Sequence, residues 1–315
     1  MNPKGQLSHT KPAPWPAVRP GRFAATIRTD SPAGCEIALL GLPDDTGVRL
    51  NHGRPGADEG PAAFRAALAS YGVPWDGLEN NPLDAGVFDA GDIVPAPGET
   101  EAALLETHAR VEKAVREIHE LGLMPVCIGG GHDLTLPCVT ALANYAGEAA
   151  GGISFDAHLD VRQEIGSGMA FRRLIETKKL DPKRFAVMGA GRFVNEAAHL
   201  HWLTKKGASV LFSDDDPDTD LIVATYKKAL TKSHSNFVSI DMDGIDSCQA
   251  PGVSALNPLG SGVLEAGSVA ELAGSNPLVY HFDLMELSPR HDPSGRTARI
   301  AAHLFLTFLA GFVTR

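Results

Sequence analysis

The sequence predicts an α/β fold in which helices cover both faces of a parallel sheet. Two observations carry this prediction. From residue 35 onward, short apolar runs alternate with longer amphipathic ones, an alternation typical of parallel sheets. The 315 residues are 43% apolar and 21% charged, which is an ordinary globular composition with enough apolar material for a large core.

Eight apolar runs are expected to be strands, and eight amphipathic runs are expected to be helices. The helix at 99–121 is the clearest, because its apolar residues recur close to every 3.6 positions, opposite charged ones. The expected strands are 36–41, 86–89, 125–129, 152–156, 184–189, 209–212, 236–241 and 279–283. The other expected helices lie roughly at 60–70, 134–146, 168–178, 195–206, 218–230, 264–273 and 296–312.

Residues 1–34 differ from the rest of the chain. They are rich in proline and in basic side chains, and they lack the alternation of apolar runs that follows. This composition predicts an extended N-terminal arm or a disordered tail. No linker interrupts the chain after the arm, so we expect residues 35–315 to form a single catalytic domain.

Charge and composition exclude several classes of partner. The net charge is −10, which disfavours nucleic acid as a ligand because phosphate backbones require clustered Lys and Arg. No stretch approaches the length of a membrane span, and the N-terminus has no apolar signal core. Four cysteines form no Cys-x-x-Cys pair. Cys35 and Cys127 lie in apolar runs and Cys138 lies in an expected helix, so buried thiols are expected. These features predict a cytoplasmic enzyme in a reducing compartment.

Three short runs, each at the end of an expected strand, carry the chemistry of this chain. The carboxyl ends of parallel strands meet at one edge of a sheet, and ligands bind there in open α/β folds. The runs 129–132, 156–160 and 239–243 fall at that edge. They offer two imidazoles and four carboxylates, namely His132, Asp156, His158, Asp160, Asp241 and Asp243.

The spacing within these runs brings the polar groups together. Side chains two residues apart project to one side of an extended segment, so Asp156, His158 and Asp160 share a side, as do Asp241 and Asp243. Six converging groups of this kind could hold two divalent cations and generate hydroxide at neutral pH.

Metal ions are the natural counter-charge for these carboxylates. Lys and Arg are absent from 151–159 and 237–248, and an ionised carboxylate taken from water costs several kcal/mol unless it is paired. A set rich in carboxylates, with two histidines, suits a hard ion such as Mn²⁺ better than Zn²⁺. The sequence therefore predicts a metal centre of the manganese type.

The motifs resemble the signatures of the ureohydrolase family, which comprises arginases, agmatinases and formimidoylglutamases. The resemblance rests on Gly-Gly-Gly-His at 129–132, Asp-Ala-His-Leu-Asp at 156–160, and Ser-Ile-Asp-Met-Asp-Gly-Ile-Asp at 239–246 followed by Ala-Pro-Gly at 250–252. Their order and spacing fit over about residues 35–313. The resemblance implies a three-layer α/β/α fold, a mainly parallel eight-stranded sheet, two Mn²⁺ per chain, and homo-oligomers that are trimers or hexamers.

The resemblance also implies a role for each matching residue. His132, Asp156, Asp160 and Asp241 would hold one ion, and Asp156, His158, Asp241 and Asp243 the other. Glu286 matches the family's glutamate that faces the cationic carbon of the substrate. Asp160 is expected to carry a proton to the leaving amine, because it can contact both a metal ion and the attacking water.

Other segments resemble the formimidoylglutamase branch of the family. The run at 47–61 is close to that branch, and Ser167 stands where many other members carry histidine. The expected reaction is hydrolysis of N-formimidoyl-L-glutamate to L-glutamate and formamide, a step of histidine degradation. Because this substrate carries two carboxylates, cationic and polar side chains should bind it; the candidates are Arg54, Arg162, Arg192, Asn195 and Ser254.

Three alternatives remain open from the sequence. An agmatinase or a guanidino-acid hydrolase would release urea from a related substrate with the same metal centre. A zinc-dependent deacetylase would need about three ligands rather than six. A non-catalytic binding protein would be expected to lose ligands, whereas all six are present here.

Overall fold

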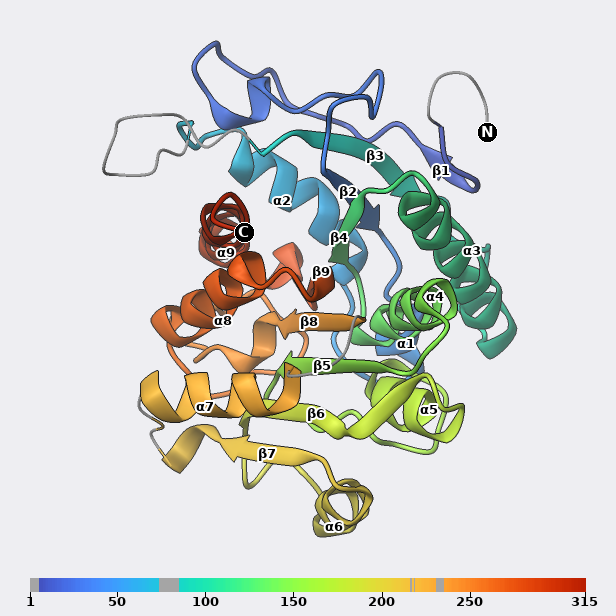
Figure 1. Cartoon of the computed structure of the whole chain (residues 1–315), viewed down its shortest axis with the longest axis vertical. Helices are drawn as coiled ribbons and strands as arrows, with labels where there is room; N and C mark the ends of the chain where they lie inside the picture. The colour runs from blue at the N-terminus through green and yellow to red at the C-terminus, as the bar shows by residue number, and fades with distance from the viewer. Residues whose placement is uncertain (1–5, 74–84, 216, 218, 231–234) are drawn as a thin grey trace.

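Nine strands form a single sheet in the computed structural model of the chain, which describes residues 6–73, 85–215, 217, 219–230 and 235–315 (Figure 1). The strand order is β1-β3-β2-β4-β9-β8-β5-β6-β7, and every pair is parallel except β1 with β3. The strands are β1 (Thr10–Lys11), β2 (Ile37–Leu42), β3 (Val87–Ile93), β4 (Met124–Gly129), β5 (Ala150–Phe155), β6 (Leu180–Ala190), β7 (Ser209–Phe212), β8 (Asn236–Asp241) and β9 (Val279–Met285).

Helices cover both faces of the sheet and give three layers (Figure 1). One face carries α2 (Gly60–Leu68), α7 (Thr219–Leu230), α8 (Val263–Ser275) and α9 (Arg296–Phe312). The other face carries α3 (Glu101–Glu120), α4 (Thr135–Ala146), α5 (Ala170–Glu176) and α6 (Ala197–Lys206), with the short α1 (Thr46–Leu50) beside α3.

Alternation along the strands produces the two cores. In β4, Val126 and Ile128 pack with the α9 layer, whereas Cys127 between them packs with α3 and α4. Because successive strand side chains face opposite ways, a strand buried on both faces must be apolar throughout. This explains why the central strands read as unbroken apolar runs rather than as alternating ones.

The predicted fold class is confirmed, with one additional strand. All eight expected strands are present, and their observed ends differ from the expected ones by a few residues at most. The ninth strand, β1, comes from the N-terminal arm, where proline-rich sequence gave no strand signal. The sequence analysis also did not anticipate α1. The expected helix at 218–230 is observed from Thr219, since residue 218 lies outside the described residues.

The described part of the arm lies along the body of the protein. Thr10 and Lys11 pair with β3, and Arg28 forms a further bridge to the same strand. Trp15 donates a hydrogen bond of 2.6 Å from Nε1 to Asp89. In this structure, these contacts hold described residues of the arm against β3.

Four neighbouring strands in the middle of the sheet position the polar runs. The order β4-β9-β8-β5 places the carboxyl ends of these strands side by side, so the residues that follow them meet at one edge. In the described part of the chain, no helix is both long and apolar enough to cross a membrane.

Candidate metal centre

The six candidate ligands all lie at this edge of the sheet. His132 opens a 3-10 turn that follows β4, Asp156 directly follows β5, and Asp241 ends β8. Two local turns fix the carboxylates: Asp156 Oδ1 accepts from the His158 N–H at 2.6 Å, and Asp241 Oδ1 accepts from the Asp243 N–H at 2.7 Å. Such turns are typical of aspartate after a strand.

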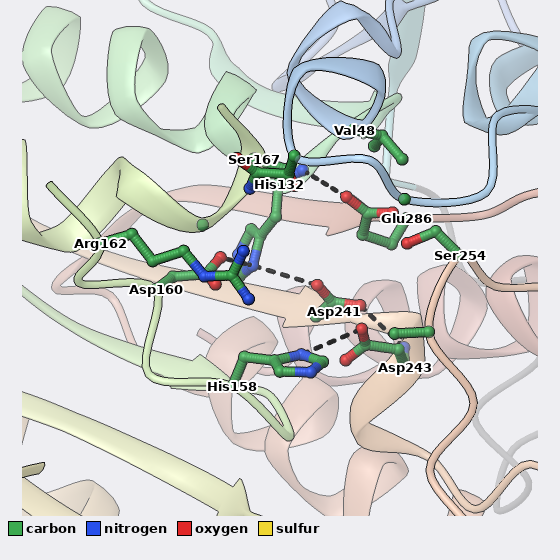
Figure 2. A pocket seen from close by; sticks show the side chains of 14 residues that line it. Val48, His132, His158, Asp160, Arg162, Ser167, Asp241, Asp243, Ser254 and Glu286 are labelled. Carbon is green, nitrogen blue, oxygen red and sulfur yellow. Dashed lines mark hydrogen bonds and ion pairs between the residues drawn. The ribbon is translucent and has the colours of Figure 1, made fainter. Parts of the chain in front are cut away.

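One group of side chains gathers around His132. Its Nδ1 lies 3.0 Å from Asp156 Oδ2, 3.0 Å from Asp160 Oδ2 and 3.1 Å from Asp241 Oδ2. Figure 2 shows His132, Asp160 and Asp241 pointing toward one another. One nitrogen and three oxygens therefore converge from three different strand ends.

A second group gathers around His158 and shares a member with the first. His158 Nδ1 lies 3.2 Å from Asp243 Oδ2 and 3.6 Å from Asp156 Oδ1. The two oxygens of Asp156 thus face different histidines, one in each group. This carboxylate is placed to bridge two ions.

Several buried atoms of these side chains lack a hydrogen-bond partner, as expected of ligands that hold a pair of cations. His132 Nδ1, Asp156 Oδ2 and Asp243 Oδ1 are buried and have no hydrogen-bond partner among the described residues. Since buried polar atoms are rarely left unpaired, a bound ion is the natural partner. The donors are carboxylate oxygens and imidazole nitrogens without any sulfur, a set that suits Mn²⁺.

Burial and mutual repulsion shift the pKa values of these groups. Burial first, and then Asp243 and Asp156, raise the pKa of Asp241 well above its usual range. The charge of Asp243 raises the pKa of His158. For His132, burial opposes the charged form, but the surrounding carboxylates outweigh it and raise the pKa. Without cations, the site therefore holds protons that an exposed set would release.

Glu286 shows the same effect. It is 3% exposed, and burial, with the nearby charge of Asp243, raises its pKa to about 8. Between its unfolded pKa of 4.5 and about 8, the folded cation-free protein binds more protons at this group than the unfolded chain does. Stability is then lost as the pH rises through that window.

We therefore expect the thermal midpoint of the cation-free protein to decrease as the pH is raised from about 5 to about 8. The raised pKa values of Asp241, His132 and His158 act in the same direction. Thermal melts of chelator-treated protein across this range measure the effect. Glu286→Gln should make the thermal midpoint depend less on pH, whereas Glu59→Gln, at an exposed glutamate, should leave this pH dependence unchanged. A midpoint that rises with pH would contradict the raised pKa values assigned to these buried groups.

A buried hydrogen-bond chain behind the site orients His132. Ser239 Oγ accepts from His132 Nε2 at 2.9 Å and donates to Asp283. Asp283 also accepts from Thr135 at 3.1 Å. With Nε2 carrying the proton, Nδ1 keeps its lone pair toward the carboxylates, which is the form a metal ion needs.

Ser239→Ala should weaken cation binding while leaving the fold intact. Removing the hydroxyl frees the His132 ring to rotate and to change tautomer, and loss of such an orienting partner typically costs about 10–100-fold in metal affinity. Titration of chelator-treated protein with Mn²⁺ measures the loss. Ser268→Ala, on the exposed side of α8, is the matched control, and equal affinities for the two variants would refute the orienting role.

The two candidate catalytic carboxylates have an unusual backbone conformation. Asp160 has φ of 47° and Glu286 has φ of 61°, a left-handed region that side-chain-bearing residues seldom occupy. Glu286 Oε1 accepts the His132 N–H at 2.9 Å, which leaves Oε2 buried without a hydrogen-bond partner. Its free oxygen is available to a bound molecule.

Arg162 and Ser254 line the same pocket as the metal candidates and Glu286. Within the described chain, the Arg162 guanidinium makes no hydrogen bond or ion pair with protein groups; only its backbone N–H is bonded, to Gly168 at 2.8 Å. Figure 2 shows the side chain reaching into the pocket across from Glu286. An unpaired guanidinium at this position can receive an anion.

The other three substrate-binding candidates are engaged elsewhere. Arg54 donates to the backbone of 253–254 at 2.7 and 3.0 Å and so supports the loop that carries Ser254. Asn195 holds the 157–159 loop, because its side chain accepts from the Leu159 N–H and donates to the Ala157 carbonyl. Arg192 forms ion pairs with Asp214 and Asp215 and lies outside the residues that line the pocket.

Two residues that line the pocket were not among the substrate-binding candidates predicted from the sequence. Asn51 lines the pocket and hydrogen-bonds the side chain of Ser167 at 3.2 Å, and Val48 adds an apolar wall. Both lie in the 47–61 run, whose resemblance to one branch of the family is the signal that points to them.

Comparison with known proteins identifies the family. A family model described as the arginase family matches residues 35–311. The chain therefore belongs to the arginase family, and it is a hydrolase.

Several proteins named formimidoylglutamase are similar to this chain over most of its length. The protein of that name from Geobacillus thermodenitrificans is 33% identical over 87% of this chain and 84% of its own length. The one from Halobacterium salinarum is 34% identical over 88% of each chain. The crystal structure of Trypanosoma cruzi formiminoglutamase with Mn²⁺ superposes with a TM-score of 0.85 at 30% identity, covering 93% of this chain and 99% of that one.

A more distant structure has the same architecture. Proclavaminate amidino hydrolase from Streptomyces clavuligerus is 24% identical and superposes with a TM-score of 0.81 over 94% of this chain and 98% of that one. At this identity the likeness establishes the fold alone.

Proposed function

We propose that the chain hydrolyses N-formimidoyl-L-glutamate to L-glutamate and formamide with two Mn²⁺ per chain. Water adds to the formimidoyl carbon, and the bond from that carbon to the glutamate nitrogen breaks. The observation that carries the proposal is the pairing, in one pocket, of five metal-type ligands with a carboxylate oxygen on Glu286 that has no hydrogen-bond partner and an unpaired guanidinium on Arg162. The sixth ligand, Asp156, contacts His132 and His158 from behind. The formimidoylglutamase relatives support the choice of substrate.

Two ions would be held by the two groups at the sheet edge. His132, Asp156, Asp160 and Asp241 would hold one, and Asp156, His158, Asp241 and Asp243 the other. When bound, Mn²⁺ supplies Lewis acidity that lowers the pKa of water toward neutrality.

Glu286 would hold the cationic end of the substrate. A formimidoyl group is an amidinium when protonated, and its N–H groups match a carboxylate in a charge-assisted contact. Glu286 Oε1 is fixed by the His132 N–H at 2.9 Å, so Oε2 faces the ligand. This contact orients the electrophilic carbon next to the metal groups.

Asp160 would carry the proton that the leaving amine needs. Its side chain lines the pocket and is 10% exposed. Burial, with the charge of Asp156, raises the pKa of this carboxyl above its usual value. A carboxylate beside both an ion and the attacking water would accept a proton from that water and return it to the glutamate nitrogen as the C–N bond breaks.

Arg162 would bind a carboxylate of the glutamate portion. Arginine presents several donors in a plane and suits bidentate recognition of a carboxylate. Ser254 and Asn51 add polar groups to the same pocket. We propose that Arg54 and Asn195 support this pocket through the loops that they hold.

The direct test is formamide release from N-formimidoyl-L-glutamate by Mn²⁺-loaded protein. Chelator-treated protein is the matched control, and agmatine and a guanidino acid are the competing substrates. We expect rapid formamide release that depends on Mn²⁺. Urea release from a guanidino acid, without turnover of the formimidoyl compound in protein that holds two ions, would overturn the proposal.

Arg162→Gln should raise KM for N-formimidoyl-L-glutamate much more than it lowers kcat. Hydrogen bonds to charged groups contribute about 1.5–3 kcal/mol, so the expected rise in KM is about 10–100-fold. Steady-state kinetics measure it. Arg173→Gln, at an exposed guanidinium on α5, is the matched control, and an unchanged KM in Arg162→Gln would remove this residue from substrate recognition.

We also propose a cellular location and an oligomeric state for the enzyme. Four free cysteines suit a reducing compartment, and we propose a cytoplasmic location. The family resemblance supports a homo-oligomer of three or six chains.

A further inference from the structure

A second set of metal-type side chains lies buried inside the protein, between the sheet and its α3/α4 layer. Cys127 is on β4, Cys138 on α4 and His281 on β9. Both thiol sulfurs and one ring nitrogen of His281 lie within 4.8 Å of one another. All three residues are 0% exposed, and none of them belongs to the pocket that holds the catalytic candidates.

The separation of the two sulfurs suits a shared ion. Cys127 Sγ and Cys138 Sγ are 3.9 Å apart. Two thiolates on one tetrahedral Zn²⁺, each with a Zn–S bond of about 2.3 Å, lie about 3.8 Å from each other. A disulfide would need about 2.05 Å, so the two cysteines are not bonded; they form an S–H···S hydrogen bond, and this spacing also fits two ligands of one ion.

The histidine has the arrangement of a metal ligand. His281 Nε2 hydrogen-bonds Asp283 Oδ2 at 2.8 Å, and Nδ1 is buried without a hydrogen-bond partner among the described residues. Metal-binding histidines commonly donate one ring N–H to a carboxylate and present the other nitrogen to the ion. An unpaired imidazole nitrogen in an apolar interior is otherwise costly.

One further buried imidazole, outside this cluster, is affected by the charge of His281. His119, on α3, is 3% exposed and its Nε2 also has no hydrogen-bond partner in the described structure. Burial, with the neighbouring His281, lowers the pKa of His119 to about 3. Its ring is therefore neutral at physiological pH and keeps a lone pair available.

We propose that Cys127, Cys138 and His281 form a second, buried cation site that takes Zn²⁺. Binding displaces one proton from each thiol, and two thiolates with a neutral imidazole balance the two charges of the ion. The ion and its ligand set together are thus electrically neutral, and the buried carboxylate of Asp283 lies behind them as the hydrogen-bond partner of His281. This ion would be structural, because no pocket-lining residue contributes to its ligand set.

Burial of the thiols explains why they need the ion. Burial, with the adjacent Cys127, raises the pKa of the Cys138 thiol well above its ordinary value. Without a cation, the Cys138 sulfur remains protonated and inert. Zinc binding would exchange the thiol protons for strong bonds and tie together three elements of the fold.

Cobalt provides a probe that separates this site from the catalytic one. The catalytic candidates offer only nitrogen and oxygen, so a thiolate-to-cobalt charge-transfer absorption reports a cysteine ligand, and the variants below distinguish Cys138 from the exposed Cys248. Full-length protein produced in cobalt-supplemented medium, so that the ion enters as the chain folds, should show this absorption. Zn²⁺-grown protein should carry one equivalent of zinc that Mn²⁺ does not displace.

Variants make the test specific. Cys138→Ala should lose the absorption and the retained zinc, whereas Cys248→Ser, at an exposed thiol, should keep both. Formamide release by Cys138→Ala shows that the variant is folded; if it does not fold, the wild-type spectrum alone decides. Folded, cobalt-loaded wild-type protein without the absorption, or a disulfide between the two cysteines, would overturn the proposal.

Discussion

Asp241→Asn is expected to abolish turnover without lowering the stability of the cation-free protein. Asp241 contacts the His132 group through Oδ2 and fixes Asp243 through Oδ1. Its carboxylate is proposed to bridge both ions, so the amide should lower kcat/KM by at least about a thousandfold because water is no longer acidified. In cation-free protein, the change removes one of several buried carboxylates that repel one another.

Two measurements separate this outcome from simple damage. Mn²⁺ should raise the thermal midpoint of the wild-type protein, since a ligand that binds only the native state stabilises it. The Asp241→Asn variant should show no such rise, while its cation-free midpoint equals or exceeds that of the wild type. Asp181→Asn, at a carboxylate paired with Arg184 far from the pocket residues, should behave as wild type. Near-normal activity of Asp241→Asn would refute the binuclear assignment.

Glu286→Gln is expected to lower kcat/KM by about a hundredfold or more while both ions stay bound. The glutamine oxygen can still accept the His132 N–H, so the metal groups keep their geometry. What disappears is the negative charge beside the amidinium, and removal of one electrostatic partner of a reacting group typically costs about 100–1000-fold.

Metal analysis together with kinetics checks this prediction. Two equivalents of Mn²⁺ and a large loss of kcat/KM are the expected pair of results. Glu59→Gln, at an exposed glutamate that pairs with Arg290, is the matched control. If Glu286→Gln instead loses metal in proportion to its activity, Glu286 acts on the metal centre rather than on the substrate.

The sequence was sufficient for the sheet and for the convergence of the candidate ligands. Apolar runs buried on both faces identified the strands, and Asp156, His158 and Asp241 were expected at strand ends because parallel sheets place ligands there. The order of strands was not predictable from the residues alone. That order makes β4, β9, β8 and β5 neighbours and so brings Glu286 to His132.

Side-chain pairing could not be read from the sequence. Arg162 and Arg192 both follow strand ends, and only the structure shows that Arg192 is neutralised by Asp214 and Asp215 while Arg162 is free within the described chain. The left-handed backbone at Asp160 and Glu286 was equally hidden, because few residues other than glycine adopt it and no sequence pattern marks these two positions. Long-range contacts decide both features.

The N-terminal arm also determines how the sheet ends. Without it, β3 would present seven residues of unpaired backbone at the margin of the sheet, and open strand edges of this kind recruit other chains into intermolecular sheets. Thr10, Lys11 and Arg28 occupy that edge instead. We therefore expect a shortened form that begins at residue 35 to self-associate more readily than the full chain.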